Sequence, residues 1–344
     1  MRKAVILFNL GGPDKLENVE PFLFNLFNDP AILNLPSFLR YPLAKLISNR
    51  RAPIAKKIYQ EIGGSSPILK LTEEQSSKLE KKLNDSQSLD EFKLFVVMRC
   101  WNPRAKDVIK NVKLYNPKEI ILLPLYPQYS AATSGSSIKE WKEISLKENF
   151  NVKTISICCY PTDKNFIKAH TKEIIKIIKN LSNFKLIFSA HGLPEKNIKK
   201  GDPYQWQVEQ SVKKIVESLG IKNLDWILSY QSRVGPLKWI GPSTDEVIIE
   251  NSKIKKHIVL VPIAFVSEHS ETLVELDIEY KKLAEENGCE QYTRVPALGI
   301  NEDFINALSE LILNKNENEF NEYISSPKIK CPSNFKKCPC LIYE

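Results

Sequence analysis

The sequence has 344 residues and lacks most of the features that would place it outside the globular proteins. No apolar run reaches the roughly 18 residues that cross a bilayer, so no membrane span is predicted. There are only 12 glycines and 21 prolines, too few for a collagen-like chain or a linker, and 42% hydrophobic residues argue against disorder. No small-residue cleavage site follows the apolar N-terminus, which we interpret as a first strand instead of a signal peptide.

Cysteines are also few, and their number, 7, is odd. An odd count in a long chain argues against a secreted disulfide framework and predicts a cytoplasmic protein. Three of them, Cys331, Cys338 and Cys340, nevertheless gather near the C-terminus. The net charge of +8 does not call for nucleic acid, because the positive residues of interest are local, between 40 and 51.

Several common catalytic motifs are missing. The turn after the first apolar run reads NLGGP (9–13), which is not the GxGxxG fingerprint, and GxxxxGK[ST] is absent. HExxH and GxSxG are absent too. The sequence therefore gives no support for a nucleotide cofactor or for ordinary hydrolase chemistry.

Apolar runs recur along the chain, and helical patterns lie between them. Continuous runs of this length are typical of strands that are buried on both faces of a parallel sheet. The alternation predicts an α/β fold with two sheets of about four strands each. We expect domains at 1–150 and 151–315 and an extension at 316–344. The predicted strands lie at 3–10, 93–100, 119–127, 153–159, 184–190, 226–232 and 257–266.

Segment 31–53 mixes large apolar residues with Arg40, Lys45, Arg50 and Arg51 and contains no acid. One interpretation is an ordinary amphipathic helix that covers a core. The other is an apolar lip with a basic rim, suited to a membrane surface or to a flat anionic ligand.

Ionisable residues concentrate at the ends of two predicted strands, where open α/β sheets bind ligands. His191 follows one strand in SAHGLP (189–194). After the other, helical spacing would place Glu271, Glu275 and Glu279 in one row, with Glu268 and His269 at the helix start. Carboxylates and imidazoles suit ions such as Fe²⁺ and also accept protons, although solvated acidic faces are common. Tyr126 and Trp239, near other strand ends, are candidates for a flat apolar pocket or for core packing.

These motifs together resemble the ferrochelatases, the terminal enzymes of haem synthesis. The resemblance covers most of the chain. It rests on RRAP (50–53), YQEIGGSSPI (59–68), LYPQYSAATSGSS (125–137), SAHGLP (189–194), KKGDPY (199–204), SYQSRVGPLKWIGPSTDEVI (229–248) and VPIAFVSEHSETLVELDIEY (261–280). It implies two Rossmann-like, chelatase-type domains. The first would carry the porphyrin lip, and the second would carry His191 and the acidic helix.

By this resemblance the chain inserts Fe²⁺ into protoporphyrin IX and releases two protons, without a nucleotide. His191 would be the metal ligand or pyrrole base, and Glu271 would stand opposite it as metal ligand and catalytic residue. Glu268, His269, Glu275 and Glu279 would form an acidic path for protons or metal. The family's porphyrin contacts match Arg50, Arg51, Tyr59, Arg99, Tyr126, Ser130 and Trp239.

The family also implies a [2Fe-2S] cluster for many members, held by one internal cysteine and three near the C-terminus. Here these are Cys158, Cys331, Cys338 and Cys340. Cys159 is the alternative internal ligand, but adjacent strand residues point to opposite faces, so only one of the two can serve. Unrelated thiols or a zinc site remain the other interpretations.

The remaining expectations concern the substrate, the class of function and the partners. Coproporphyrin III is the alternative substrate, and a haem- or iron-sensing binding protein is the alternative from another class. Residues 31–51 would touch the inner face of the cytoplasmic membrane peripherally. No nucleic acid is expected, and a homodimer is left open.

Overall fold

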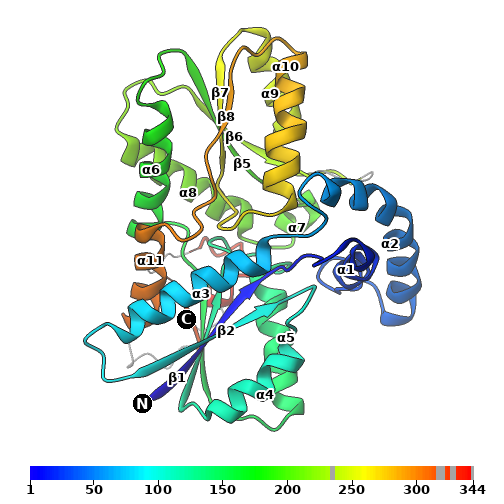
Figure 1. The fold of residues 1–344 in the computed structure, drawn as a ribbon, viewed down its shortest axis with the longest axis vertical. Coiled ribbons are helices and arrows are strands. Elements are labelled where there is room, and N and C mark those ends of the chain that lie inside the picture. The colour runs from blue at the N-terminus through cyan, green and yellow to red at the C-terminus, as the bar shows by residue number, and fades with distance from the viewer. Residues whose placement is uncertain (233–236, 315–321, 326–330, 342–344) are drawn as a thin grey trace. The chain divides into compact units, whose positions relative to one another are not determined.

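The computed structural model describes residues 1–232, 237–314, 322–325 and 331–341. The chain folds into two compact units. Figure 1 labels the helices and strands that form them. The first comprises Met1–Cys158 and Leu308–Ile324, and the second comprises Cys159–Ala307 and Ser325–Glu344. The division falls inside strand β4, helix α11 and strand β9, whereas the predicted boundary lies near residue 150. Part of the predicted extension, 316–321, 326–330 and 342–344, lies outside the described residues.

The first unit contains a sheet of order β2-β1-β3-β4-β9. Strand β1 is buried from Lys3 to Asn9, and its pairings with β2 and β3 are parallel, as continuous apolar runs predict. The sheet has five strands and not the four predicted, because the three-residue β9 has no apolar run that would reveal it. The strands are β1 (Arg2–Asn9), β2 (Glu91–Met98), β3 (Glu119–Pro124), β4 (Lys153–Cys159) and β9 (Tyr323–Ser325).

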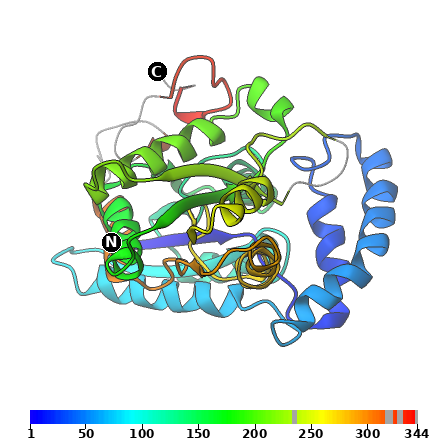
Figure 2. The same cartoon turned by 90° about the horizontal axis from the view of Figure 1, so that it is seen from above.

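Helices of the first unit complete its core. Trp141 of α5 and Ile109 of α4 pack with Phe8 and Ile6 of β1 in one buried cluster. Helices α1 and α2 lie side by side in both views of the ribbon (Figures 1 and 2). The helices are η1 (Leu16–Asn18), α1 (Val19–Phe27), α2 (Ser37–Gln60), α3 (Ile68–Asn84), α4 (Ala105–Tyr115) and α5 (Ser134–Lys147).

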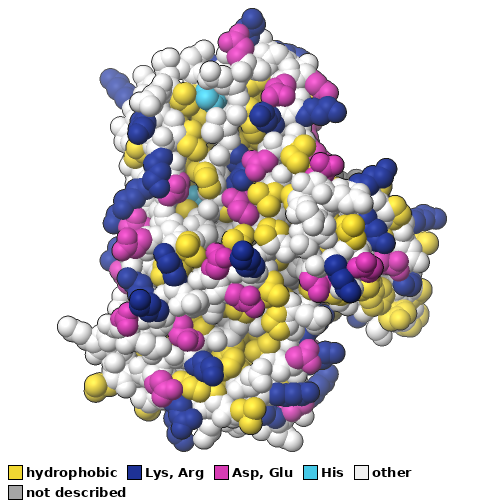
Figure 3. Space-filling view, in the orientation of Figure 1, with side chains coloured by type: hydrophobic (Ala, Val, Ile, Leu, Met, Phe, Trp, Pro, Cys, Tyr) yellow, Lys and Arg dark blue, Asp and Glu magenta, His cyan; other side chains and the backbone are white. Residues whose placement is uncertain are grey.

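Helix α2 carries the apolar and basic segment. Phe38, Tyr41 and Ile54 are among its exposed apolar residues, and the space-filling view shows hydrophobic side chains over this helix (Figure 3). This leaves part of the helix's apolar surface in solvent, unlike a helix that only covers a core. Among the described residues, no helix combines the length and the apolar character needed to cross a bilayer.

The second unit contains a sheet of order β6-β5-β7-β8, and all its pairings are parallel. This sheet has four strands, the number predicted, but the predicted strand at 153–159 is β4 of the first sheet, and β8 was not predicted. They are β5 (Phe184–His191), β6 (Trp226–Gln231), β7 (His257–Pro262) and β8 (Tyr292–Arg294). Its helices are α6 (Lys164–Ile178), α7 (Glu195–Lys199), α8 (Tyr204–Leu219), α9 (Thr244–Lys253), the π-helix η2 (Glu271–Glu279) and α10 (Tyr280–Glu286). Helix α11 (Glu302–Leu313) crosses the division, and η3 (Pro339–Leu341) lies near the C-terminus.

His170 of α6 is a buried histidine whose ring has no polar partner in the described part of the chain. Its side chain is fully buried against Phe166, with ring centroids 4.8 Å apart. Neither ring nitrogen has a hydrogen-bond partner among the described residues. Burial therefore lowers the pKa of His170 to about 3 from its ordinary value near 6.5.

We expect this histidine to make the protein sensitive to acid. The unfolded chain binds a proton near pH 6.5 but the folded chain only near pH 3, so the contribution of His170 to stability is full above pH 6.5 and falls as the pH drops. Between pH 7 and pH 5 the loss is about 2 kcal/mol. In urea unfolding, His170→Leu should reduce the difference in stability between these pH values by that amount. An unchanged difference would contradict the prediction.

Candidate active site

His191 is the last residue of β5, at the carboxyl end of the second sheet. Its Nδ1 lies 2.6 Å from the carbonyl oxygen of Gly192. Because a carbonyl only accepts hydrogen bonds, Nδ1 carries the proton in the neutral ring and Nε2 carries the lone pair. The phenol of Tyr204 donates to the His191 carbonyl at 3.1 Å and so ties down the backbone here. His191 therefore presents a basic nitrogen from a fixed position.

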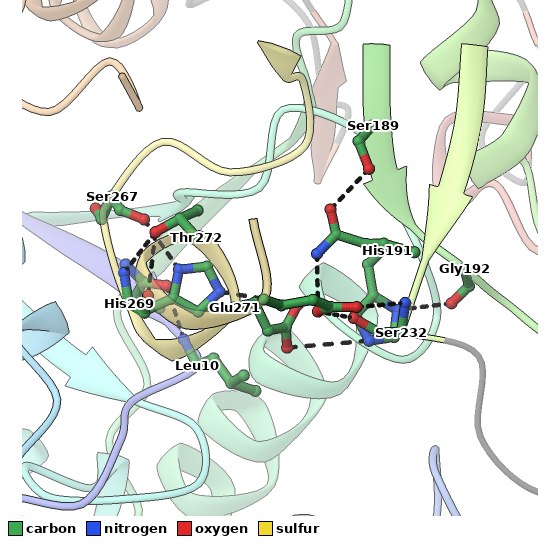
Figure 4. Close-up of polar contacts among 12 residues, drawn as sticks. Leu10, Ser189, His191, Gly192, Ser232, Ser267, His269, Glu271 and Thr272 are labelled. Atoms are coloured by element: carbon green, nitrogen blue, oxygen red, sulfur yellow. Dashed lines mark hydrogen bonds and ion pairs between the residues drawn. The ribbon is translucent and has the colours of Figure 1, made fainter. Parts of the chain in front are cut away.

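Glu271 lies between two imidazoles (Figure 4). Its Oε1 is 4.0 Å from Nε2 of His191, and its Oε2 is 3.9 Å from Nε2 of His269. Both distances exceed a hydrogen bond, and among the described residues Oε2 has no hydrogen-bond partner. Burial opposes ionisation, but His191 and His269 outweigh it and lower the pKa of Glu271. The site thus holds a carboxylate with unused capacity for a cation or a proton.

His269 is oriented by the loop that precedes the π-helix. Its Nδ1 lies 3.1 Å from the Ser267 carbonyl oxygen, so its Nε2 faces Glu271. Its backbone N–H donates to the Thr272 hydroxyl at 3.0 Å. Burial would lower the pKa of His269, but the nearby negative charge of Glu271 raises it above the ordinary value.

Glu275 lies next to Glu271 and is held by several donors. It accepts hydrogen bonds from the Ser232 backbone N–H at 3.0 Å, the Ser232 hydroxyl at 2.6 Å, the Gln231 amide at 3.1 Å and the Tyr280 phenol at 3.2 Å. Ser232 has a φ of 60°, a strained value for a non-glycine residue. Burial, followed by repulsion from Glu271, raises the pKa of Glu275. Neighbouring carboxylates with opposite pKa shifts are suited to holding and passing a proton.

The acidic segment is a π-helix over Glu271–Glu279, and the expectation of an α-helical row was wrong. A π-helix bonds i to i+5, so residues four apart no longer follow the α-helical row. Glu271 and Glu275 are partly buried and belong to the site, whereas Glu279 is exposed. Such π-helical turns occur frequently at functional sites.

Glu268 has a different environment from the other acids. Its Oε1 accepts hydrogen bonds from Nη1 of Arg294 and from the backbone N–H of Ala297, both at 2.9 Å. Burial opposes its ionisation, but the Arg294 charge lowers the pKa of Glu268. Arg294 also pairs with Asp277 of the π-helix, with Nε to Oδ1 at 2.6 Å and Nη2 to Oδ2 at 2.7 Å. The structure therefore places Glu268 in a partly buried ion pair beside the site.

Arg99 of the first unit, predicted to contact porphyrin, has protein partners. It pairs with Asp29 at 2.8 Å and with Glu140 at 3.3 Å, and it donates to the Ser136 hydroxyl at 2.7 Å. Only 12% of its side chain is exposed. Its guanidinium is thus engaged within its own unit.

The other predicted porphyrin contacts vary in exposure and remain predictions. Arg50 and Arg51 are exposed on α2, and Arg51 lies 5.9 Å from the Phe27 ring centroid. Tyr59 is buried in the cluster beneath α1 and α2. The Tyr126 hydroxyl is buried without a hydrogen-bond partner among the described residues. Ser130 is buried, and the half-buried Trp239 pairs through its backbone with Pro194.

Cysteines predicted as ligands lie close together. The Sγ atoms of Cys158, Cys338 and Cys340 lie within 4.8 Å of one another. Contact with the Cys338 thiol, and then burial, raises the pKa of Cys331. Cys158 is the last residue of the first unit before the division, and its strand, β4, continues into the second unit. The neighbouring Cys159 thiol instead accepts a hydrogen bond from Gln207 at 3.4 Å.

The ferrochelatase family model matches residues 2–316. The chain belongs to the ferrochelatase family. It is 79% identical over 344 residues to the ferrochelatase of Pelagibacter ubique, covering 100% of both chains. It is 51% identical over 345 residues to that of Rickettsia felis, covering 99% of this chain and 98% of the relative. SirB from Bacillus subtilis, solved with Fe³⁺, shares the fold at a TM-score of 0.54 and 14% identity, covering 91% and 95% of the two chains.

Three residues of this ferrochelatase-family site were missed in the sequence. Gln231 ends β6 directly opposite His191 of β5 in the parallel register, and Ser232 follows it. The signal was present, because polar residues that follow neighbouring parallel strands meet at one edge of the sheet. Arg294 was missed as well, since its partners Glu268 and Asp277 lie in a different segment.

Proposed function

We propose that this chain inserts Fe²⁺ into protoporphyrin IX to form haem. The observation that carries the proposal is the Glu271 carboxylate, which faces Nε2 of His191 at 4.0 Å while its other oxygen has no hydrogen-bond partner among the described residues. Family membership and full-length relatives named ferrochelatase support the same reaction. A basic nitrogen opposite a carboxylate suits both tasks of the reaction, metal transfer and proton removal.

The charges define what the residues must do. Fe²⁺ replaces two pyrrole protons, so the site has to accept protons as the dication enters. Nε2 of His191 has the lone pair that accepts a pyrrole proton, and Glu271 stabilises the resulting imidazolium. Burial and the charge of Glu271 raise the pKa of Glu275. Glu275 is therefore placed to take up a proton and pass it on.

An insertion assay with purified protein tests this function. Fe²⁺ or Zn²⁺ is supplied with protoporphyrin IX or coproporphyrin III, and loss of free-porphyrin fluorescence gives the rate. We expect insertion with faster turnover of protoporphyrin IX. Faster turnover of coproporphyrin III would contradict the assignment of protoporphyrin IX as the substrate. Porphyrin binding without metal insertion would indicate a binding protein instead of an enzyme.

We propose peripheral membrane association through 31–51 on a separate observation. Phe38, Leu39, Tyr41 and Leu46 are exposed on α2, and Arg50 and Arg51 are exposed on the same helix. An apolar surface with basic neighbours suits a bilayer with anionic headgroups. Homodimer formation is left open.

We further propose that Cys158, Cys331, Cys338 and Cys340 hold a [2Fe-2S] cluster. Three of their sulfur atoms lie within 4.8 Å of one another, and the fourth residue contacts Cys338, so the donor set fits. Four thiolates are a standard ligand set for such a cluster, which supplies one-electron chemistry when bound.

Cys338→Ser is expected to abolish the cluster. The wild-type protein should show a thiolate-to-iron absorption band at about 450 nm. The band should vanish in Cys338→Ser and in Cys158→Ser but persist in Cys159→Ser and in Cys100→Ser, whose cysteine is buried in the first unit. Loss of the band in Cys159→Ser but not in Cys158→Ser would show that Cys159, and not Cys158, is the internal ligand. If the wild-type protein contains zinc and lacks the absorption band, the cysteines form a zinc site and the cluster proposal is wrong.

A further inference from the structure

Gln207 of α8 is a fully buried amide whose nitrogen faces two thiols. Its Nε2 donates to Sγ of Cys159 and to Sγ of Cys331, both at 3.4 Å. Sulfur is a weak acceptor as a thiol, and a charged thiolate makes the same hydrogen bond considerably stronger. A buried donor directed at sulfur is therefore suited to a cysteine that binds a metal as thiolate.

The cysteine-bearing segment 331–341 is held on the second unit independently of Gln207. The Lys337 backbone N–H donates to the Gly201 carbonyl at 3.0 Å. Gly201 has a φ of +90°, and a Cβ there would lie 2.8 Å from the Lys336 backbone nitrogen. Cys331 and Cys338 also pack with Phe335, Ile198 and Trp206 in a small apolar cluster. Changing the Gln207 amide thus removes the bonds to sulfur and leaves this docking in place.

We propose that Gln207 is a positioning residue of the cysteine site. Its amide N–H stabilises the Cys331 thiolate as a metal ligand and holds Cys159 beside the site as a thiol that does not ligate. This inference rests on the proposed metal-binding role of the four cysteines. Hydrogen bonds to ligand sulfur strengthen metal binding and stabilise the more negative, reduced state of an iron–sulfur cluster.

Cobalt binding tests the proposal without any activity assay. Co²⁺ is titrated into reduced, metal-free full-length protein and followed by thiolate-to-cobalt absorption. Gln207→Met keeps the length of the side chain but has no N–H, and we expect it to weaken Co²⁺ binding about tenfold. Gln205→Met, on the same turn of α8 but only half-buried, is the matched control and should leave the affinity unchanged. Equal affinity of Gln207→Met and wild type, with equal thermal stability, would overturn the proposal.

The midpoint potential of the iron–sulfur cluster is a second measurement, and it separates the proposal of the cluster from the proposal for Gln207. If the wild-type protein carries the cluster, the midpoint potential of the cluster should fall in Gln207→Met and stay constant in Gln205→Met. If wild-type protein carries no iron–sulfur cluster, the cofactor proposal fails, and the cobalt titration alone decides the role of Gln207. Absence of cobalt–thiolate absorption in the wild-type protein would overturn both.

Discussion

Glu271→Gln is expected to lower the rate of metal insertion about 1,000-fold, because a positioned acid–base group typically contributes between about 10² and 10⁴. The substitution keeps the size of the side chain and removes the charge that faces His191 and His269. Porphyrin binding should change little, since the amide keeps the shape of the site. Single-turnover insertion of Zn²⁺ and porphyrin fluorescence titration measure the two quantities separately.

The same variant should change the titration of His269. Glu271 raises the pKa of this imidazole against the effect of burial, so its removal should lower that pKa. NMR titration of metal-free protein would show the change directly. Glu279→Gln is the matched control, because Glu279 lies on the same π-helix but is exposed. Insertion within tenfold of wild type in Glu271→Gln, or an equal loss in Glu279→Gln, would contradict the assigned role.

Residues of the site that lie near regular, buried strands were predictable from the sequence. Continuous apolar runs predicted β5 closely, because a strand buried on both faces is mostly apolar. The run at 257–266 predicted β7 too, but this strand already ends at Pro262. The predicted position of β5 made His191 a candidate site residue, since ligand sites form at the carboxyl ends of parallel strands. The acids of 268–279 were found by composition, but the helix that carries them was assigned the wrong hydrogen-bond pattern.

The π-helix was not predictable because its partners lie on a strand that the sequence does not reveal. Strand β8 has only three residues, Tyr292–Arg294. The Tyr292 phenol donates to the Leu276 carbonyl inside the π-helix at 2.6 Å, and Arg294 pairs with Asp277. These tertiary contacts stabilise an arrangement that local propensity disfavours. Missing β8 and missing the π-helix therefore have the same cause.

Arg99 illustrates the same limit for charged residues. Its side chain was assigned to porphyrin because a family motif contains an arginine at that place. The sequence cannot show that Asp29 and Glu140, each far from Arg99 along the chain, lie within ion-pair distance. A buried arginine is normally paired, and these partners meet that need, while its contact with porphyrin stays a prediction.

His191→Ala is expected to reduce insertion by about 10² to 10⁴ while porphyrin binding is retained. The backbone should stay in place, because β5 pairs with β6 and β7, the Gly192 N–H donates to Gln231 at 2.9 Å and Tyr204 holds the His191 carbonyl. With 38% of the His191 side chain exposed, free imidazole should enter the vacated space and restore part of the rate. His257→Ala, at the opposite end of the same sheet, should keep full activity. Full activity of His191→Ala would exclude it as the base, and loss of activity without any rescue by imidazole would indicate a structural role instead.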